Sequence, residues 1–191
     1  MNKELELKLV EKYPEVLRDY DGDPKVTCLS WGLECSDSWY KILDDLFGYL
    51  TNHMKRQLYV RYSSEYREKN EGAFDYAFNA PKIILDQVKS KWACLRVYYH
   101  TDFEELPEEI YQNLDISDFN KTIQWYNDRI DSAISYAEYL SRRTCEVTGK
   151  EGKVYSGGWW TVMCDEEAIK AGYDLVTGKR ANPNDQQNNN N

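Results

Sequence analysis

Residues 39–52 read WYKILDDLFGYLTN, and this stretch carries the strongest helical pattern in the chain. Its apolar residues recur three and four positions apart, which places them on one face of a helix. Ser36 or Asp37 can cap the helix, because a short polar side chain accepts hydrogen bonds from the first free amides. The stretch therefore predicts a helix with one face in the core, formed by Trp39, Ile42, Leu43, Leu46, Phe47 and Leu50.

A longer helical pattern covers residues 118–143, with Ser117 or Asp118 as its cap. About 25 helical residues span about 38 Å, which is long enough to cross a small domain. We expect this helix to be the central packing element. Its apolar stripe consists of Phe119, Ile123, Tyr126, Ile130, Ala133, Ile134, Ala137 and Leu140.

The N-terminal third predicts shorter elements. Residues 2–19 favour a helix that Pro14 interrupts, because a proline ring clashes with the preceding turn. Residues 27–34 favour a short strand. We interpret Cys28 and Cys35 as buried small apolar residues, since free cysteine packs in this way.

Residues 53–79 form an insert rich in Lys, Arg and Tyr. The simplest interpretation is a solvated hairpin or helix; the alternative is a surface that contacts a partner. Residues 81–91 predict a helix that starts at Pro81, and residues 93–100 predict a strand with alternating faces. The side chains expected to hold these elements in place are Tyr59, Val60, Tyr62, Phe74, Ile84, Leu85, Val88, Leu95, Val97 and Tyr99.

Composition limits the function classes. The chain has 191 residues, a net charge of −9 and five cysteines. An acidic chain lacks the basic footprint that nucleic acid requires, and it is not attracted to anionic membranes. No apolar run approaches the ~20 residues of a membrane span. Neither a leader peptide nor a disulfide framework is indicated, so we expect reduced thiols in a cytoplasm.

Residues 143–167 read RTCEVTGKEGKVYSGGWWTVMCDEE, with the spacing of a small zinc site. Such a site takes two pairs of Cys or His ligands, each pair separated by two to four residues. Here the four positions are Cys145, Thr148, Cys164 and Glu167, and a threonine is no zinc ligand. We interpret the stretch as a metal-free remnant packed on Val147, Trp159, Trp160 and Val162; a weak zinc site is the alternative.

Three segments of the chain carry a common set of glycine, cysteine, tryptophan and charged residues. These are Gly22-Asp23-Pro24, Cys28, Trp31-Gly32, Glu34-Cys35, Trp39, Gln87-Val88-Lys89, Lys91-Trp92, Leu95-Arg96, Tyr98, Cys145, Gly149, Gly152, Gly157-Gly158, Trp159-Trp160 and Cys164. Together the three segments resemble uncharacterised small proteins of bacteriophages and prophages that end in a zinc-ribbon-like segment. The resemblance implies a phage origin and no particular chemistry.

No phosphate-binding glycine loop, zinc-protease helix or serine-hydrolase elbow is present in the sequence. We therefore predict a non-enzymatic phage accessory protein that binds a host bacterial protein in the cytoplasm, as a host-takeover or anti-defence inhibitor. The first alternative is a protein that sequesters a nucleotide in an aromatic pocket; the others are a metal-dependent enzyme and a nucleic-acid mimic with its acidic face at residues 102–118. The candidate partner- or ligand-binding residues are Trp31, Trp39, Arg96, Arg143, Tyr155, Trp159 and Trp160.

The expected fold is α+β, with three or four helices packed on a small, mostly antiparallel sheet. We expect one domain over residues 1–177 that ends in a degenerate treble-clef-like ribbon at residues 143–171. A hairpin of residues 153–155 and 160–163, a short helix over 165–171 and a last strand over 172–176 complete it. The polar residues 178–191 have the composition of a disordered tail.

Overall fold

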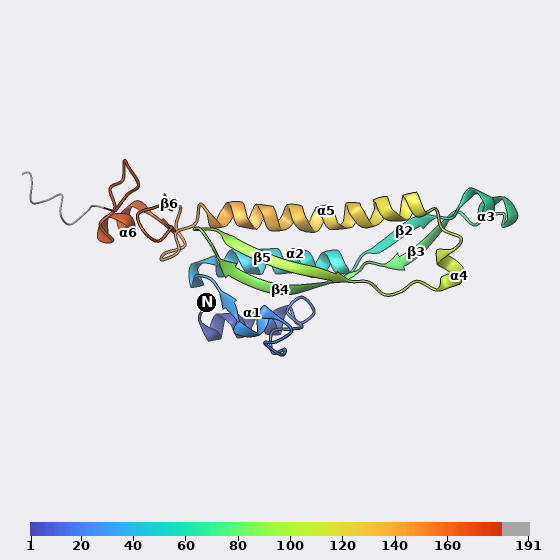
Figure 1. The fold of residues 1–191 in the computed structure, drawn as a ribbon, viewed down its shortest axis with the longest axis horizontal. Helices are drawn as coiled ribbons and strands as arrows, with labels where there is room; N and C mark the ends of the chain where they lie inside the picture. Colours follow the sequence, from blue (N-terminus) through green and yellow to red (C-terminus); the bar gives the residue numbers. More distant parts are fainter. Residues whose placement is uncertain (181–191) are drawn as a thin grey trace, which may run out of the picture.

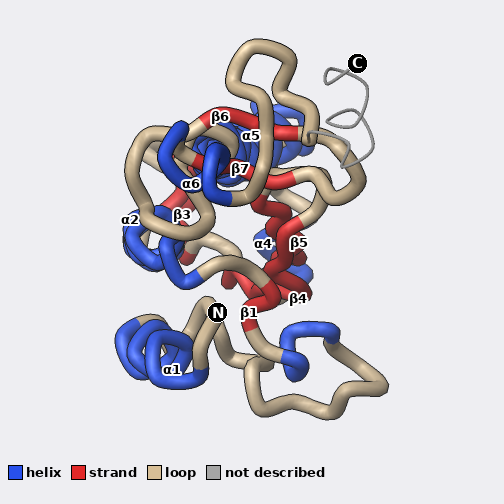
Figure 2. The backbone as a smooth tube through the Cα atoms, turned by 90° about the vertical axis from the view of Figure 1, so that its left-hand side faces the viewer, coloured by secondary structure: helices blue, strands red, loops and turns tan. Residues whose placement is uncertain are grey.

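Helix α2 (Tyr40–Met54) lies at the centre of an elongated molecule, of which the computed structural model describes residues 1–180. Figure 2 shows α5 (Ile116–Ser141) above and α1 (Lys3–Lys12) below, with α2 and the main sheet between them. The α+β class is confirmed. The remaining elements are β1 (Leu33–Glu34), β2 (Gln57–Arg61), α3 (Ser64–Lys69), β3 (Asp75–Asn79), β4 (Lys82–Ser90), β5 (Leu95–Asp102), α4 (Glu108–Tyr111), β6 (Lys153–Tyr155), β7 (Thr161–Met163) and α6 (Asp165–Lys170).

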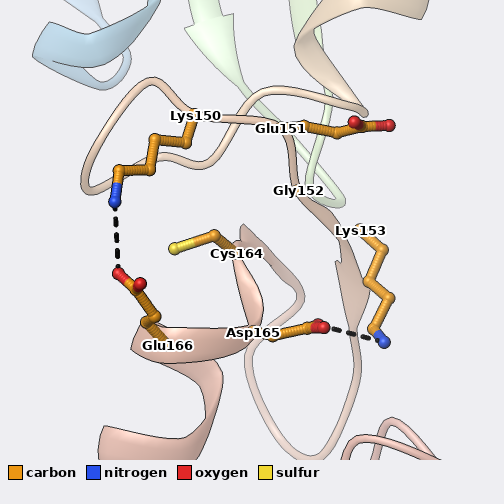
Figure 3. Close-up of a pocket in the computed structure, with 7 residues that line it drawn as sticks. All are labelled: Lys150, Glu151, Gly152, Lys153, Cys164, Asp165 and Glu166. Carbon is orange, nitrogen blue, oxygen red and sulfur yellow. Dashed lines mark hydrogen bonds and ion pairs between the residues drawn. The ribbon is translucent and has the colours of Figure 1, made fainter.

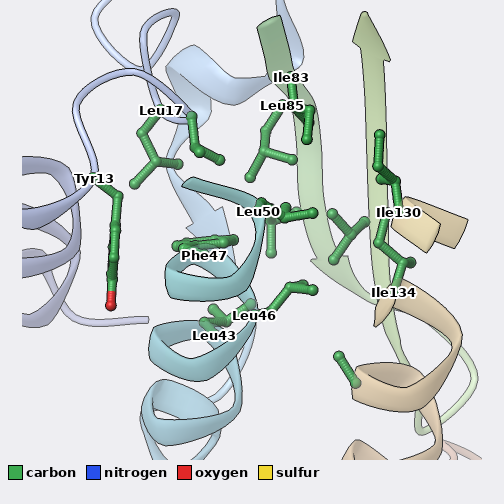
Figure 4. Packing of buried hydrophobic residues seen from close by; sticks show 14 of the residues in the cluster. Tyr13, Leu17, Leu43, Leu46, Phe47, Leu50, Ile83, Leu85, Ile130 and Ile134 are labelled. Atoms are coloured by element: carbon green, nitrogen blue, oxygen red, sulfur yellow. The ribbon is translucent and has the colours of Figure 1, made fainter. Parts of the chain in front are cut away.

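Buried side chains from the chain after α1, from β4 and from α5 meet those of α2. Figure 4 shows Phe47 and Leu50 of this helix between Leu17 on one side and Ile130 on the other. Seven of the 15 residues of α2 are buried, whereas only five of the 26 residues of α5 are. The central packing element is therefore α2 rather than the longer helix, because α2 is covered from both sides.

Helix α2 begins as the sequence predicts, after a short 3₁₀ turn over Asp37–Trp39. The Ser36 hydroxyl accepts a hydrogen bond from the Ser38 amide at 3.3 Å. Helix α5 begins two residues earlier than predicted. Its cap is Asp115, whose carboxylate accepts from the Asp118 amide at 3.1 Å.

The main sheet has the order β1-β4-β5, with β1 parallel to β4 and β5 antiparallel to it. The prediction of a helix over residues 81–91 is wrong, since these residues form β4. A bulge explains the error: Asp86 is the extra residue between the pairs Leu85–Tyr99 and Gln87–Tyr98. It puts Leu85 and Val88 on the same buried face although they are three positions apart, which imitates the spacing of a helix.

The insert at residues 53–79 is mainly a hairpin of β2 and β3 with α3 at its tip, one of the two predicted forms (Figure 1). Leu58 and Val60 face the core, and Tyr62 packs against the edge of it. The predicted packing of Tyr59 and Phe74 is wrong, because both rings are largely exposed. Side chains alternate between the two faces of β2. Tyr59 therefore points away from the buried face that holds Leu58 and Val60.

Two N-terminal predictions are also corrected. Helix α1 ends at Lys12, just before Pro14. Residues 27–34 are not one strand but a 3₁₀ turn over Cys28–Trp31 followed by the two-residue β1. Cys28 is exposed on that turn, whereas Cys35 is buried as predicted.

The C-terminal segment, residues 143–180, contains the antiparallel pair β6–β7 and then α6. The predicted hairpin and short helix are both present. The predicted strand over 172–176 is wrong, because Asp174 folds these residues into a turn by accepting bonds from Val176 and Thr177 amides. Residues 178–180 close this turn, and the rest of the predicted tail, 181–191, lies outside the described residues.

Among the helices of residues 1–180, none combines the length and the apolar composition that a membrane span needs.

Candidate functional site

The two cysteines of the C-terminal segment lie on either side of a threonine hydroxyl. Residues 145–149 form a tight turn in which the Gly149 amide donates to the Cys145 carbonyl at 2.9 Å. The hydroxyl of Thr148 lies 3.7 Å from Sγ of Cys164, which directly precedes α6. The hairpin β6–β7 thus brings the two halves of the predicted site together.

Cys145 is wholly buried, and the pKa of its thiol is lowered. Burial raises the pKa of this thiol, but hydrogen bonds from the Thr148 hydroxyl and from the amides of Cys164, Thr148 and Val147 outweigh burial and leave it lowered. Amides that point at a sulfur stabilise the thiolate.

The fourth position of the predicted site is occupied by an ion pair. Glu167 lies 2.6 Å from the Lys170 ammonium, one turn further along α6. Within residues 1–180, no three His, Cys, Asp or Glu side chains are grouped closely enough to hold a metal ion.

A hollow of about 490 Å³ opens beside Cys164 (Figure 3). Its charged side chains are held in ion pairs: Lys150 lies 3.2 Å from Glu166, and Lys153 lies 3.1 Å from Asp165. The remaining carboxylate, Glu151, lies 3.4 Å from Arg143. A ligand would have to break these pairs before it gained contacts of its own. The hollow is therefore poorly suited to a charged ligand.

Two candidate aromatic residues are structural. Trp39 is wholly buried, and its indole Nε1 donates to the Thr144 carbonyl at 3.0 Å. Tyr155 is wholly buried too, and its hydroxyl donates to Asp165 at 3.0 Å. Neither ring is free to stack on a ligand.

Both candidate arginines are engaged in ion pairs. Arg96 of β5 lies 2.5 Å from Glu138 of α5, and Arg143 lies 3.4 Å from Glu151. The candidate Trp31 is 64% exposed on its 3₁₀ turn. The structure does not assemble these residues into one aromatic and basic pocket.

The remaining two candidates, Trp159 and Trp160, are at the surface. They are 83% and 44% exposed, and Val147 is 60% exposed, so the predicted packing of the segment on these three residues is wrong; only Val162 is buried. Trp160 meets Trp92 edge to face, with ring centroids 6.1 Å apart. We call Trp92, Trp159 and Trp160 the tryptophan surface.

The third member of this surface, Trp92, was missed as a site residue in the sequence. It lies in the two-residue turn between β4 and β5, closed by a 2.8 Å bond from the Lys91 amide to the Cys94 carbonyl. Trp92 and Ala93 both have left-handed backbone angles, with φ of 55° and 54°. This turn type normally takes Asn-Gly, because glycine and asparagine tolerate the left-handed conformation. Most other residues cost about 1–2 kcal/mol there.

No protein-family model matches the chain, and neither a curated protein nor a solved structure matches it. The site is therefore interpreted from its own residues.

Proposed function

We propose that this chain is a phage accessory protein that binds a host bacterial protein stoichiometrically, as an inhibitor of a host enzyme or defence component in the cytoplasm. The tryptophan surface is the proposed contact. No catalytic step is part of the proposal.

The observation that carries the proposal is the turn at Trp92. The backbone there has a strained conformation, and the residue placed in it is a tryptophan that remains 62% exposed. Because its ring is largely exposed, Trp92 gains too little from burial to offset the strain of the turn. Strained turns with exposed aromatic residues are typical of recognition sites, because tryptophan dominates the energetics of protein interfaces.

The nucleotide-sequestering alternative has less support. Trp39 and Tyr155 are buried, and Arg96 and Arg143 are paired with carboxylates. A stacking pocket would need one of these rings free beside an unpaired guanidinium.

We also propose that residues 143–171 are a degenerate treble-clef-like ribbon that has lost its zinc. The turn at Cys145, the hairpin and the helix after Cys164 support this, and the Thr148 hydroxyl lies 3.7 Å from Sγ of Cys164. In this proposal a hydroxyl and hydrogen bonds substitute for the metal.

The contact is tested by affinity retrieval from bacterial lysate followed by native mass spectrometry of the complex. The test variant is Trp92→Asn with Ala93→Gly, which removes the ring and installs the preferred turn residues. We expect loss of the partner together with a free energy of unfolding that is unchanged or up to about 2 kcal/mol higher, because relief of strain offsets the lost ring pair.

Tyr59→Thr is the matched control, since Tyr59 is a similarly exposed ring on β2, outside the tryptophan surface. It should retain the partner. A partner that binds the turn variant as well as the natural protein would exclude this surface, and a retained nucleotide with no protein partner would favour sequestration.

A further inference from the structure

A second hollow lies at the other end of α5. It has a volume of about 470 Å³, and most of its lining comes from the connector after β5, from α4 and from the first turns of α5. Figure 1 shows that α4 lies at the opposite end of α5 from α6. The 26 residues of α5 separate it from the tryptophan surface. Its lining is mainly apolar and includes Phe103, Leu106, Tyr111, Phe119 and Ile123.

Two aromatic rings of this hollow, Phe103 and Tyr111, each meet Phe119 nearly at a right angle. Phe103 and Phe119 have centroids 5.8 Å apart and planes at 89°. Tyr111 and Phe119 have centroids 5.9 Å apart and planes at 87°. Perpendicular rings form adjoining walls rather than a closed stack, and a ring face attracts a positive charge.

The charged side chains of the lining all have one sign. Glu105 and Glu108 are exposed at the hollow, and among residues 1–180 no Lys or Arg lines it. Within the same part of the chain, the hydrogen bond that Glu108 accepts comes from the neutral amide of Gln112, at 2.9 Å. In the hollow beside Cys164, by contrast, Lys150 and Lys153 neutralise the carboxylates. The negative charge here is left for a ligand.

We propose that this hollow binds an organic cation: an ammonium or guanidinium group attached to an apolar body. The body would fill the aromatic walls, and the positive charge would lie between the rings and the two carboxylates. The volume falls within the range of small-molecule pockets. The site is independent of the tryptophan surface, and its failure would leave that surface untouched.

The full chain is titrated with three probes of matched shape: phenethylammonium, 2-phenylethanol and 3-phenylpropionate. Backbone amide NMR shifts report the location, and α4 and the start of α5 should respond. We expect the neutral alcohol to bind about tenfold more weakly than the cation, and the anion more weakly still. Equal binding of cation and alcohol, or no binding of the cation, would overturn the proposal.

A capped Phe-Lys dipeptide distinguishes the source of the cation. Tighter binding than phenethylammonium indicates a basic side chain of a polypeptide; weaker binding indicates a free amine. Either result is compatible with the proposed chemistry.

Two double variants with the same change in net charge test the carboxylates. Glu105→Gln with Glu108→Gln alters the lining, whereas Glu104→Gln with Glu109→Gln alters the neighbouring positions that do not line the hollow. Only the first pair should abolish the preference for the cation over the alcohol. An equal loss in both would indicate a general acidic field and would contradict a site.

A third variant tests the ring itself. Tyr111→Leu keeps an apolar side chain in a position that is 46% exposed, so the fold should tolerate it. We expect the affinity for the cation to fall about threefold and that for the alcohol to change little, because only the cation gains from the ring face.

Discussion

The body of the molecule, residues 1–142, and the C-terminal segment, residues 143–180, are stabilised by different kinds of contact. The body has one continuous cluster of buried apolar side chains from α1, α2, β4, β5 and α5. Of the segment, only Val162 belongs to that cluster, and Val154 packs at its margin. Burial of apolar area drives folding of the body, whereas the segment buries only a small set of such side chains, among them Tyr155, Val162 and Ala168.

Polar contacts dock the segment on the body instead. The Trp39 indole donates to the Thr144 carbonyl, and the Ser38 hydroxyl donates to the Cys145 carbonyl at 2.8 Å. Inside the segment, Glu146 accepts from the Val162 amide at 2.9 Å. The comparison shows how a segment with only a small core of its own can keep its structure by attachment to a larger neighbour.

The largest expected effect is on the body. Phe47→Ala removes a wholly buried ring from the centre of α2 and should lower the free energy of unfolding by about 3–5 kcal/mol. Urea denaturation followed by circular dichroism measures it. Phe74→Ala, at a ring that is 68% exposed, is the control and should cost less than about 0.5 kcal/mol. Similar losses in both would contradict the central place of α2.

Restoring ligands should give the segment a stability of its own. Thr148→Cys with Glu167→His supplies four zinc ligands at the spacing of a structural site. We expect one zinc ion per chain and a rise in the melting temperature on its addition, because bound metal stabilises only the folded segment. Elemental analysis measures the zinc content, and calorimetry measures the melting temperature. Thr148→Ser is the control, and a double variant that binds no zinc would argue against a degenerate zinc ribbon.

A smaller effect should follow from cutting one attachment. Trp39→Phe preserves most of the buried ring but removes the donor to Thr144, which costs about 1–3 kcal/mol when an acceptor is left unpaired. Hydrogen exchange should accelerate at the amides of β6 and β7 more than at those of α2. Equal acceleration in both regions would mean that the segment and the body unfold as one unit.

The sequence predicts elements well where a pattern has one interpretation. The apolar spacing of α2 and α5 leads directly to two helices, and Gly-punctuated spacing leads to the hairpin β6–β7. The bulge at Asp86 could not be read from residues 81–91, because it depends on pairing with β5 and gives β4 the spacing of a helix. The turn between β4 and β5 was missed for a similar reason. Trp92-Ala93 lacks the Asn-Gly signal, and pairing of the two strands imposes the left-handed backbone of both residues.

The candidate site was only partly predictable. The sequence identified Trp159 and Trp160 but placed them inside the segment, since aromatic residues are commonly buried. A segment of this size has too little apolar volume to cover them. The acidic stretch at residues 102–118 was recognised by composition, but the hollow beside it depends on the contacts of Phe103 and Tyr111 with Phe119, which form only in the folded chain.

The smallest expected effect is the pH dependence of the free energy of unfolding, and it arises in the body rather than in the C-terminal segment. His53 of α2 is buried and stacks on the ring of Tyr126, with centroids 4.4 Å apart. Burial lowers the pKa of this imidazole below its ordinary value of 6.5, since a charged ring would lose its hydration. The unfolded chain therefore binds the proton more readily, and stability should fall as pH drops below about 6.5, by at most about 1.4 kcal/mol per pH unit.

Denaturation at pH 7.5 and 5.5 measures this loss, and His53→Phe should reduce it because a neutral ring keeps the stack. The natural protein at the same two pH values is the control, and a loss in His53→Phe as large as in the natural protein would exclude His53 as its source. Since the C-terminal segment contains no histidine, its hydrogen exchange should respond to acid only as far as the body loosens. A segment that opens first at pH 5.5, while α2 stays protected, would show that its polar contacts are the more acid-sensitive of the two.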